Sequence, residues 1–200
     1  MTLDRAVRLL GETAPLSLMI ASHYSCALRR RGRLEQAREV GDFVTDAYRV
    51  TLGDRHPYAS GAAANNGLVL LEQGEDEPAR TVLEKALTEM TAALGEDHPW
   101  TLGIAVNTAA AHQIVGDRTD ACALSREAAL RAERVLGQRH PLTLVARLAL
   151  AADLREIKGG REEAWAIERA AVDDLADVFG TEHRLLGPAR VLWNFEPLLV

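Results

Sequence analysis

Three histidines stand in a sequence setting that could support metal binding or acid–base catalysis. In the stretch LGEDHPWT, residues 94–101, His98 follows two acidic residues. Imidazole beside carboxylate occurs both at zinc sites and at catalytic acid–base pairs. The same Leu-Gly-x-x-His-Pro phrase surrounds His56 and His140, each 42 residues from His98. What these histidines do therefore depends on the elements that carry them.

The phrase marks an internal repeat that extends over most of the 200 residues. Degenerate copies at 10–15 and 179–184 flank the three full ones, and a fixed period of this length indicates stacked supersecondary units. We predict one array, made of a partial preceding helix at 1–10, four units at 11–52, 53–94, 95–136 and 137–179, and a C-terminal capping helix with an apolar tail at 180–200.

Each unit divides into two helical halves. In the second unit, 57–73 and 75–94 lack helix breakers apart from Pro78, which suits a first turn. Apolar residues in the second half recur every three or four positions, as in an amphipathic helix. The halves are separated in every unit by a glycine, followed five residues later by an alanine: Gly32, Gly74, Gly116 and Gly159 precede Ala37, Ala79, Ala121 and Ala164. The pattern predicts an all-α fold of stacked antiparallel helix pairs.

In this frame the histidines are N-caps. The glycine of the phrase ends one helix and the proline starts the next. The histidine just before the proline can accept a hydrogen bond from a free backbone N–H of the new helix. Equivalent residues of successive units are separated by helix layers about 8–10 Å thick, whereas zinc needs its ligands within about 2.1 Å. An active site also needs several different catalytic side chains in one place, whereas the repeat provides the same histidine in equivalent positions. We therefore expect no metal, no cofactor and no catalytic residue.

Composition and charge narrow the class of protein further. The net charge of −6 argues against broad affinity for nucleic acid or anionic lipid, and no apolar run reaches the length of a membrane span. Cys26 and Cys122 are the only cysteines and have no CxxC partner, which predicts small buried side chains in a reducing compartment. No nucleotide-binding or common hydrolase motif occurs. We expect a cytoplasmic, non-enzymatic protein without nucleic-acid or membrane partners.

The glycine-alanine spacing, the paired helices and the 42-residue Leu-Gly-x-Asp-His-Pro period resemble tetratricopeptide repeats (TPRs) of the kinesin-light-chain type. Similar repeats are common in actinobacterial proteins, often beside NB-ARC-type ATPase modules. The resemblance is strongest at 56–99 and covers nearly the whole chain. It implies a right-handed α-solenoid in which the first helix of each pair lines a concave groove that holds a peptide or protein segment.

In that family an asparagine in the middle of the first helix commonly hydrogen-bonds the backbone of a bound peptide. Asn65 and Asn107, each eight residues after the repeat proline, match this position, and His23 replaces it in the first unit. One turn to either side on the same face lie Met19, Ser22, Cys26 and Arg30 in the first unit, Gly61, Leu68 and Glu72 in the second, and Gly103, Ala110 and Gln113 in the third. These thirteen residues form the predicted peptide-binding site. The alternative is that the asparagines are solvated or bond a neighbouring helix.

Two other stretches have simpler interpretations. RRRGR at 29–33 could bind an acidic peptide or phosphate, but we interpret it as a solvated helix end that faces the acidic stretch at 72–77. The apolar tail, which contains Trp193 and Phe195, is predicted to seal the last unit. Insertion of this tail into another molecule's groove is the alternative, and it makes the tail a candidate for self-association or autoinhibition.

These observations predict a scaffold that binds a peptide or partner segment in a concave groove. The alternative function is that of a sensor or regulatory TPR segment of a larger NB-ARC-type ATPase signalling protein. A nucleotide-binding module upstream of Met1 in the native reading frame would favour this alternative.

Overall fold

A computed structural model describes residues 3–179 of the chain, which divide into two compact units at the boundary between the second and third predicted repeats. In the part that it describes, all regular structure is helical, as the sequence predicts. Unit 1 contains α1 (Leu3–Leu10), α2 (Pro15–Arg30), α3 (Leu34–Leu52), α4 (Pro57–Gln73) and α5 (Asp76–Leu94). Unit 2 contains α6 (Pro99–Val115), α7 (Arg118–Leu136), α8 (Pro141–Arg155) and α9 (Arg161–Phe179).

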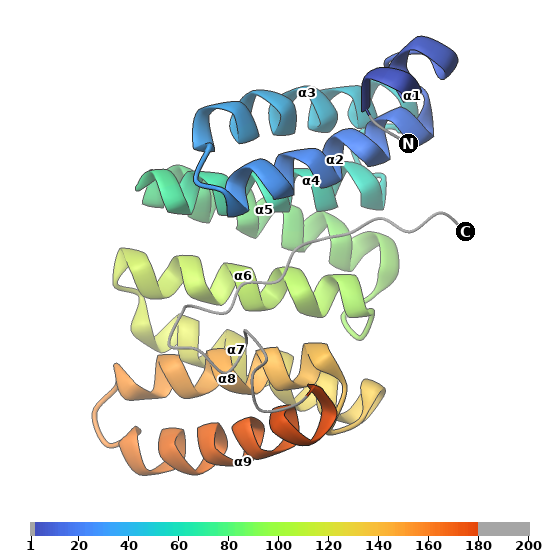
Figure 1. Ribbon diagram of the computed structural model, residues 1–200. Helices are drawn as coiled ribbons and strands as arrows, with labels where there is room; N and C mark the ends of the chain where they lie inside the picture. Colours follow the sequence, from blue (N-terminus) through green and yellow to red (C-terminus); the bar gives the residue numbers. More distant parts are fainter. Residues whose placement is uncertain (1–2, 180–200) are drawn as a thin grey trace. The chain divides into compact units, whose positions relative to one another are not determined.

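Within each unit, every helix packs against the next along the chain, and consecutive helices run in opposite directions (Figure 1). The first helices of successive repeats are also in contact, α2 with α4 in unit 1 and α6 with α8 in unit 2. Short connections enforce this arrangement, because a helix that ends at a tight turn must return alongside its neighbour. The predicted capping helix and apolar tail at 180–200 lie outside the described residues.

Glycine ends α4 and α5 as the sequence predicts, whereas α8 ends at Arg155, four residues before Gly159. Gly74 has a left-handed backbone, with φ of 78°, and its N–H bonds the last carbonyls of α4. Gly95 has φ of 86° and donates to the Thr91 carbonyl at the end of α5, at 2.9 Å. These positive φ values are accessible to glycine without the steric cost that a Cβ would impose.

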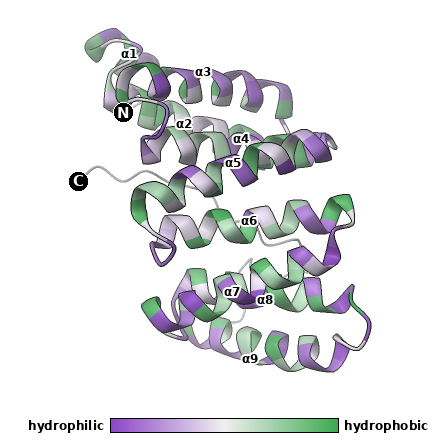
Figure 2. Ribbon diagram, turned by 180° about the vertical axis from the view of Figure 1, so that it is seen from behind, coloured by the Kyte–Doolittle hydropathy of each residue, from purple (hydrophilic) through white to green (hydrophobic). Residues whose placement is uncertain are grey.

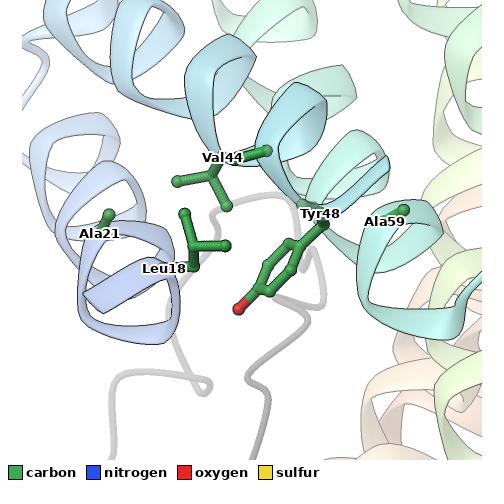
Figure 3. Close-up of a cluster of buried hydrophobic side chains, with 7 residues drawn as sticks. Leu18, Ala21, Val44, Tyr48 and Ala59 are labelled. Atoms are coloured by element: carbon green, nitrogen blue, oxygen red, sulfur yellow. The ribbon is translucent and has the colours of Figure 1, made fainter. Parts of the chain in front are cut away.

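The core of unit 1 lies where α2, α3 and α4 meet. Leu18 from α2, Val44 and Tyr48 from α3 and Ala59 from α4 are all buried in one cluster (Figure 3). A second cluster joins the other end of the same three helices and contains Leu28, Ala37 and Val69. In unit 2, Leu102, Ala132 and Leu142 form the corresponding contact of α6, α7 and α8. Small alanines in each cluster let the helix backbones approach closely.

The first and second helices of the repeats differ in polarity. Residues 101–111 of α6 are all buried, whereas the second helices bury only a narrow stripe. In α5 this stripe consists of Ala79, Leu83, Ala86 and Met90, which is narrower than predicted. Of the other residues in the predicted stripe, Val82, Leu87 and Leu94 are half-buried and Ala93 is exposed. Figure 2 shows the difference, because α3 carries many hydrophilic residues while α6 is neutral to hydrophobic over most of its length. None of the described helices is both long and apolar enough to span a membrane.

Candidate peptide-binding surface

The three repeat histidines are N-caps, which confirms their structural interpretation. The Nδ1 atom of His56 accepts from the Tyr58 backbone N–H at 3.2 Å, and that of His98 accepts from the Trp100 N–H at 3.1 Å. His140 caps α8 in the same way, at 3.2 Å from the Leu142 N–H. Only an unprotonated Nδ1 can accept, and burial lowers the pKa of His98, which favours this state. Each histidine therefore starts a first helix and fixes the register of the residues that follow.

Asn65 and Asn107 lie in the middle of these first helices, at the predicted positions. Asn65 belongs to α4 of unit 1 and is 6% exposed, and Asn107 belongs to α6 of unit 2 and is 2% exposed. A side-chain amide can donate and accept at once, so each can bond both a carbonyl and an N–H of a peptide backbone. Both side chains are thus largely covered by the protein's own atoms.

The predicted site residues of α2 differ in how exposed they are to solvent. Ser22 and Cys26 are buried, Met19 and His23 are partly buried, and Arg30 is exposed. The exposed and partly buried members lie along one side of the helix because they are spaced by four and seven residues, about one and two turns. In unit 1 this side of α2 thus offers a thioether, an imidazole and a guanidinium.

The predicted residues of α4 and α6 are mostly small and buried. Gly61 and Leu68 of α4 and Gly103 and Ala110 of α6 are buried. Glu72, at the end of α4, is partly accessible and bonds Arg29 of α2. Gln113, at the end of α6, is half-buried and its amide donates to the Ala152 carbonyl of α8 at 3.5 Å. Glu72 and Gln113 therefore link first helices within their units.

Arg29 is the residue that the sequence interpretation missed. It belongs to the basic run at 29–33, for which a solvated helix end is predicted, yet its side chain is only 8% exposed. Its Nη1 bonds the Glu72 Oε1. The run and the acidic stretch do face each other, as expected, but this pair is largely desolvated on the arginine side, which strengthens the attraction between its charges.

Neither a metal cluster nor an activated cysteine stands out in the described part of the chain. Residues 3–179 contain no group of three or more His, Cys, Asp or Glu side chains that could hold a metal ion. Cys26 and Cys122 are both buried, as predicted. Burial raises the pKa of the Cys122 thiol, an effect that the neighbouring Arg126 only partly offsets. The thiol is therefore protonated near neutral pH and is a poor nucleophile.

Comparison with known proteins identifies the repeat. Residues 61–99 and 101–142 match the tetratricopeptide repeat family model. A search of curated proteins finds no match. Among solved structures, the chain resembles nearly identical TPR-like repeats of a kinesin light chain protein from Podosopora anserina, at 21% identity and a TM-score of 0.65 over 88% of this chain and 83% of the other. A single-substitution form of that protein gives 20% identity and a TM-score of 0.68 over 88% and 82%.

A third structure has the same helical architecture. BtubC (BKLC) from P. vanneervenii aligns at 14% identity and a TM-score of 0.75, over 91% of this chain and 72% of that chain. At such low identities these likenesses show the fold alone, and the fold that they show is the all-α TPR array that the sequence predicts. The tetratricopeptide repeat model thus matches the second and third repeats, and the chain shares the helical fold of kinesin-light-chain TPR-like repeats.

Proposed function

We propose that the chain is a non-catalytic scaffold that binds a peptide or partner segment on the faces of its first helices. The TPR fold is typical of protein–protein interaction scaffolds. The observation that carries the proposal is the placement of Asn65 and Asn107, one in each unit, at the middle of a first helix with a glycine one turn earlier on the same face. Gly61 and Gly103 lie one turn earlier on the same faces, and both are buried.

In this proposal the energy of binding comes from apolar burial, and the amides determine direction. The partly buried Met19 of α2 supplies apolar area, and the amides of Asn65 and Asn107 orient the ligand by hydrogen bonding. A net charge of −6 disfavours nucleic acid and anionic membranes as partners. We also propose that the protein acts in the cytoplasm, because its two cysteines are not arranged as a disulfide framework.

The test compares two kinds of asparagine. Dodecapeptides would be selected from a random display library on the wild-type protein, and their dissociation constants measured by fluorescence anisotropy. We expect the double substitution Asn65→Ala and Asn107→Ala to weaken binding at least about tenfold, the equivalent of about 1.4 kcal/mol, while the circular dichroism spectrum stays helical. The single variants would show how much each unit contributes.

Asn66 provides the matched control. It is next to Asn65 on α4, but its Nδ2 donates to the Asp42 Oδ1 of α3 at 2.5 Å, so its side chain is held against α3. Asn66→Ala should leave peptide affinity within about twofold of wild type, whatever it does to stability. Equal affinity for the wild type and for the Asn65/Asn107 double variant would contradict the proposed surface.

A further inference from the structure

Tyr48 is a fully buried side chain with a polar atom that the fold does not use. It extends from α3 into the cluster formed by α2, α3 and α4, and it is 1% exposed. Its ring meets the edge of the Tyr58 ring, with centroids 5.6 Å apart and planes at 61°. Leu18 and Ala21 of α2 lie on one side of the ring and Ala59 of α4 on the other (Figure 3).

The hydroxyl of Tyr48 is buried and has no hydrogen-bond partner among the residues that the structure describes. A buried hydroxyl without a partner is destabilising, because it loses water and gains nothing in exchange. Phenylalanine would fill the same space without this penalty. The hydroxyl is therefore not explained by the packing of unit 1.

Comparison along the repeat leads to the same conclusion. Met90 and Ala132 lie one and two periods after Tyr48, and Leu175 is the counterpart in the fourth repeat, which has one extra residue before Gly159; all three are buried. Each is apolar, so the position requires a buried hydrophobic group and no donor. Only the first repeat places a hydroxyl here.

The direction of the ring suggests what the hydroxyl meets. Figure 3 shows the oxygen pointing away from α3, into the region between α2 and α4. These two first helices carry the residues of unit 1 that we propose for peptide binding, including Asn65. A main-chain carbonyl placed between α2 and α4 would meet this hydroxyl, which the surrounding helices otherwise cover.

We propose that Tyr48 is a binding residue of unit 1, whose hydroxyl donates a hydrogen bond to a main-chain carbonyl oxygen of the segment held against α2 and α4. The proposal rests on the proposed function and adds a ligand contact from α3, the second helix of the repeat. The positions of the first-helix residues alone do not predict this contact. Burial and the neighbouring Tyr58 raise the pKa of Tyr48 to about 12, so the phenol is neutral and able to donate at physiological pH. An extended segment, whose carbonyls are not bonded within itself, suits this donor.

The test uses the dodecapeptides selected on the wild-type protein. Tyr48→Phe should weaken their binding about threefold to tenfold, the loss expected for one desolvated hydrogen bond. The same variant should unfold at a temperature equal to or above that of the wild type, because it removes an unpartnered buried group. Thr143→Val is the matched control, since the Thr143 hydroxyl of α8 is also fully buried without a partner but belongs to unit 2. It should raise the unfolding temperature and leave the affinity of peptides that depend on Asn65 unchanged.

Each outcome decides a different point. Unchanged affinity of Tyr48→Phe for peptides that are sensitive to Asn65→Ala would overturn the role of Tyr48 and leave the proposed function standing. A lower unfolding temperature for Tyr48→Phe would show that the hydroxyl has a partner within the fold, which also overturns it. If no peptide is selected by the wild type, or none depends on Asn65 or Asn107, the proposed function fails and this inference fails with it.

Discussion

The two units join their first helices at the same repeat position with different chemistry. Arg29 at the end of α2 and Gln113 at the end of α6 are separated by two repeat periods. The Arg29 guanidinium bonds the Glu72 carboxylate of α4 in unit 1. Gln113 makes a long hydrogen bond of 3.5 Å to the Ala152 carbonyl of α8 in unit 2. The contact is ionic in one unit and neutral in the other, although the helices that it joins are equivalent.

Unit 2 has its most buried ion pair elsewhere, between α8 and α9. The Arg147 Nη1 lies 2.9 Å from the Asp174 Oδ2, with side chains 12% and 14% exposed. Gln138 donates to the same oxygen at 3.2 Å, and the Arg139 Nε lies 3.5 Å from the other oxygen. One period before Arg147 the chain has Ala105, so this pair is absent from the preceding repeat. The apolar positions are thus set by the repeat, while polar contacts are particular to each unit and give the units different responses to salt and pH.

The largest effect should come from the buried pair of unit 2. Asp174→Ala leaves the Arg147 guanidinium buried without its carboxylate, and we expect a loss of about 3 kcal/mol in the free energy of unfolding, the lower end of the range for breaking a buried pair. Urea denaturation followed by circular dichroism would measure it. Asp177→Ala is the control, because that carboxylate bonds Arg139 but is 63% exposed, and its loss should cost no more than about 0.5 kcal/mol.

The same pair predicts an acid response. Burial alone would raise the pKa of Asp174, but the hydrogen bonds from Arg147 and Gln138 outweigh it and lower the pKa below the ordinary value of 3.8. The stabilisation is therefore present above that value and is lost as the pH falls through the lowered pKa of the folded state. Equal stability of Asp174→Ala and Asp177→Ala would mean that the contact between α8 and α9 does not depend on this pair.

A smaller effect is expected from making unit 1 resemble unit 2. Arg29→Gln replaces the charged link with the side chain that occupies this position in α6, and we expect a loss of about 1 kcal/mol, moderated by the partial exposure of Glu72. Raising NaCl from about 0.05 M to about 1 M should destabilise the wild type more than this variant, because salt screens the accessible carboxylate. Urea titrations at both concentrations would show whether the salt dependence is reduced. An identical salt dependence in the two proteins would place its origin in other ion pairs.

Much of the fold could be predicted because each helix boundary has a residue with a specific backbone role. Pro57 and Gly74 bound α4, which spans 57–73 as predicted, and α5 begins at Asp76, one residue later than predicted. The ends of the apolar stripes were less well predicted. Val135 and Val178 continue the stripes of α7 and α9 but are 45% and 42% exposed. Periodicity gives the direction of a side chain, whereas its burial also requires a neighbour at that point along the helix.

The site was predicted less completely than the fold. The sequence located Asn65 and Asn107 in the first helices, and their contact with a ligand stays a prediction. Arg29 could have been recognised as buried, because Ser22 and Cys26 lie on its face of α2 and both are buried. The sequence indicates that Tyr48 belongs to an apolar stripe but cannot reveal that its hydroxyl lacks a partner, which depends on atoms from three helices.

The smallest effect concerns an N-cap of unit 2. In His98 the Nδ1 accepts the Trp100 N–H, and protonation would remove this acceptor. Burial lowers the pKa of His98 below its ordinary value of 6.5, so the folded state binds a proton less readily than the unfolded state. The stability that this cap provides is therefore present above pH 6.5 and is lost as the pH falls through the lower pKa of the folded protein.

Replacing His98 with asparagine separates capping from titration. Asparagine is a strong N-cap without a proton to gain in this range, so His98→Asn should match the wild type near pH 7.5 and exceed it by about 0.5 kcal/mol near pH 5, within the range for one cap. His98→Ala should be less stable than both near pH 7.5, because the Trp100 N–H then loses its acceptor. Urea denaturation at the two pH values measures all three proteins. If the stability of His98→Asn falls between pH 7.5 and pH 5 as steeply as that of the wild type, the acid response in this range does not come from the His98 cap.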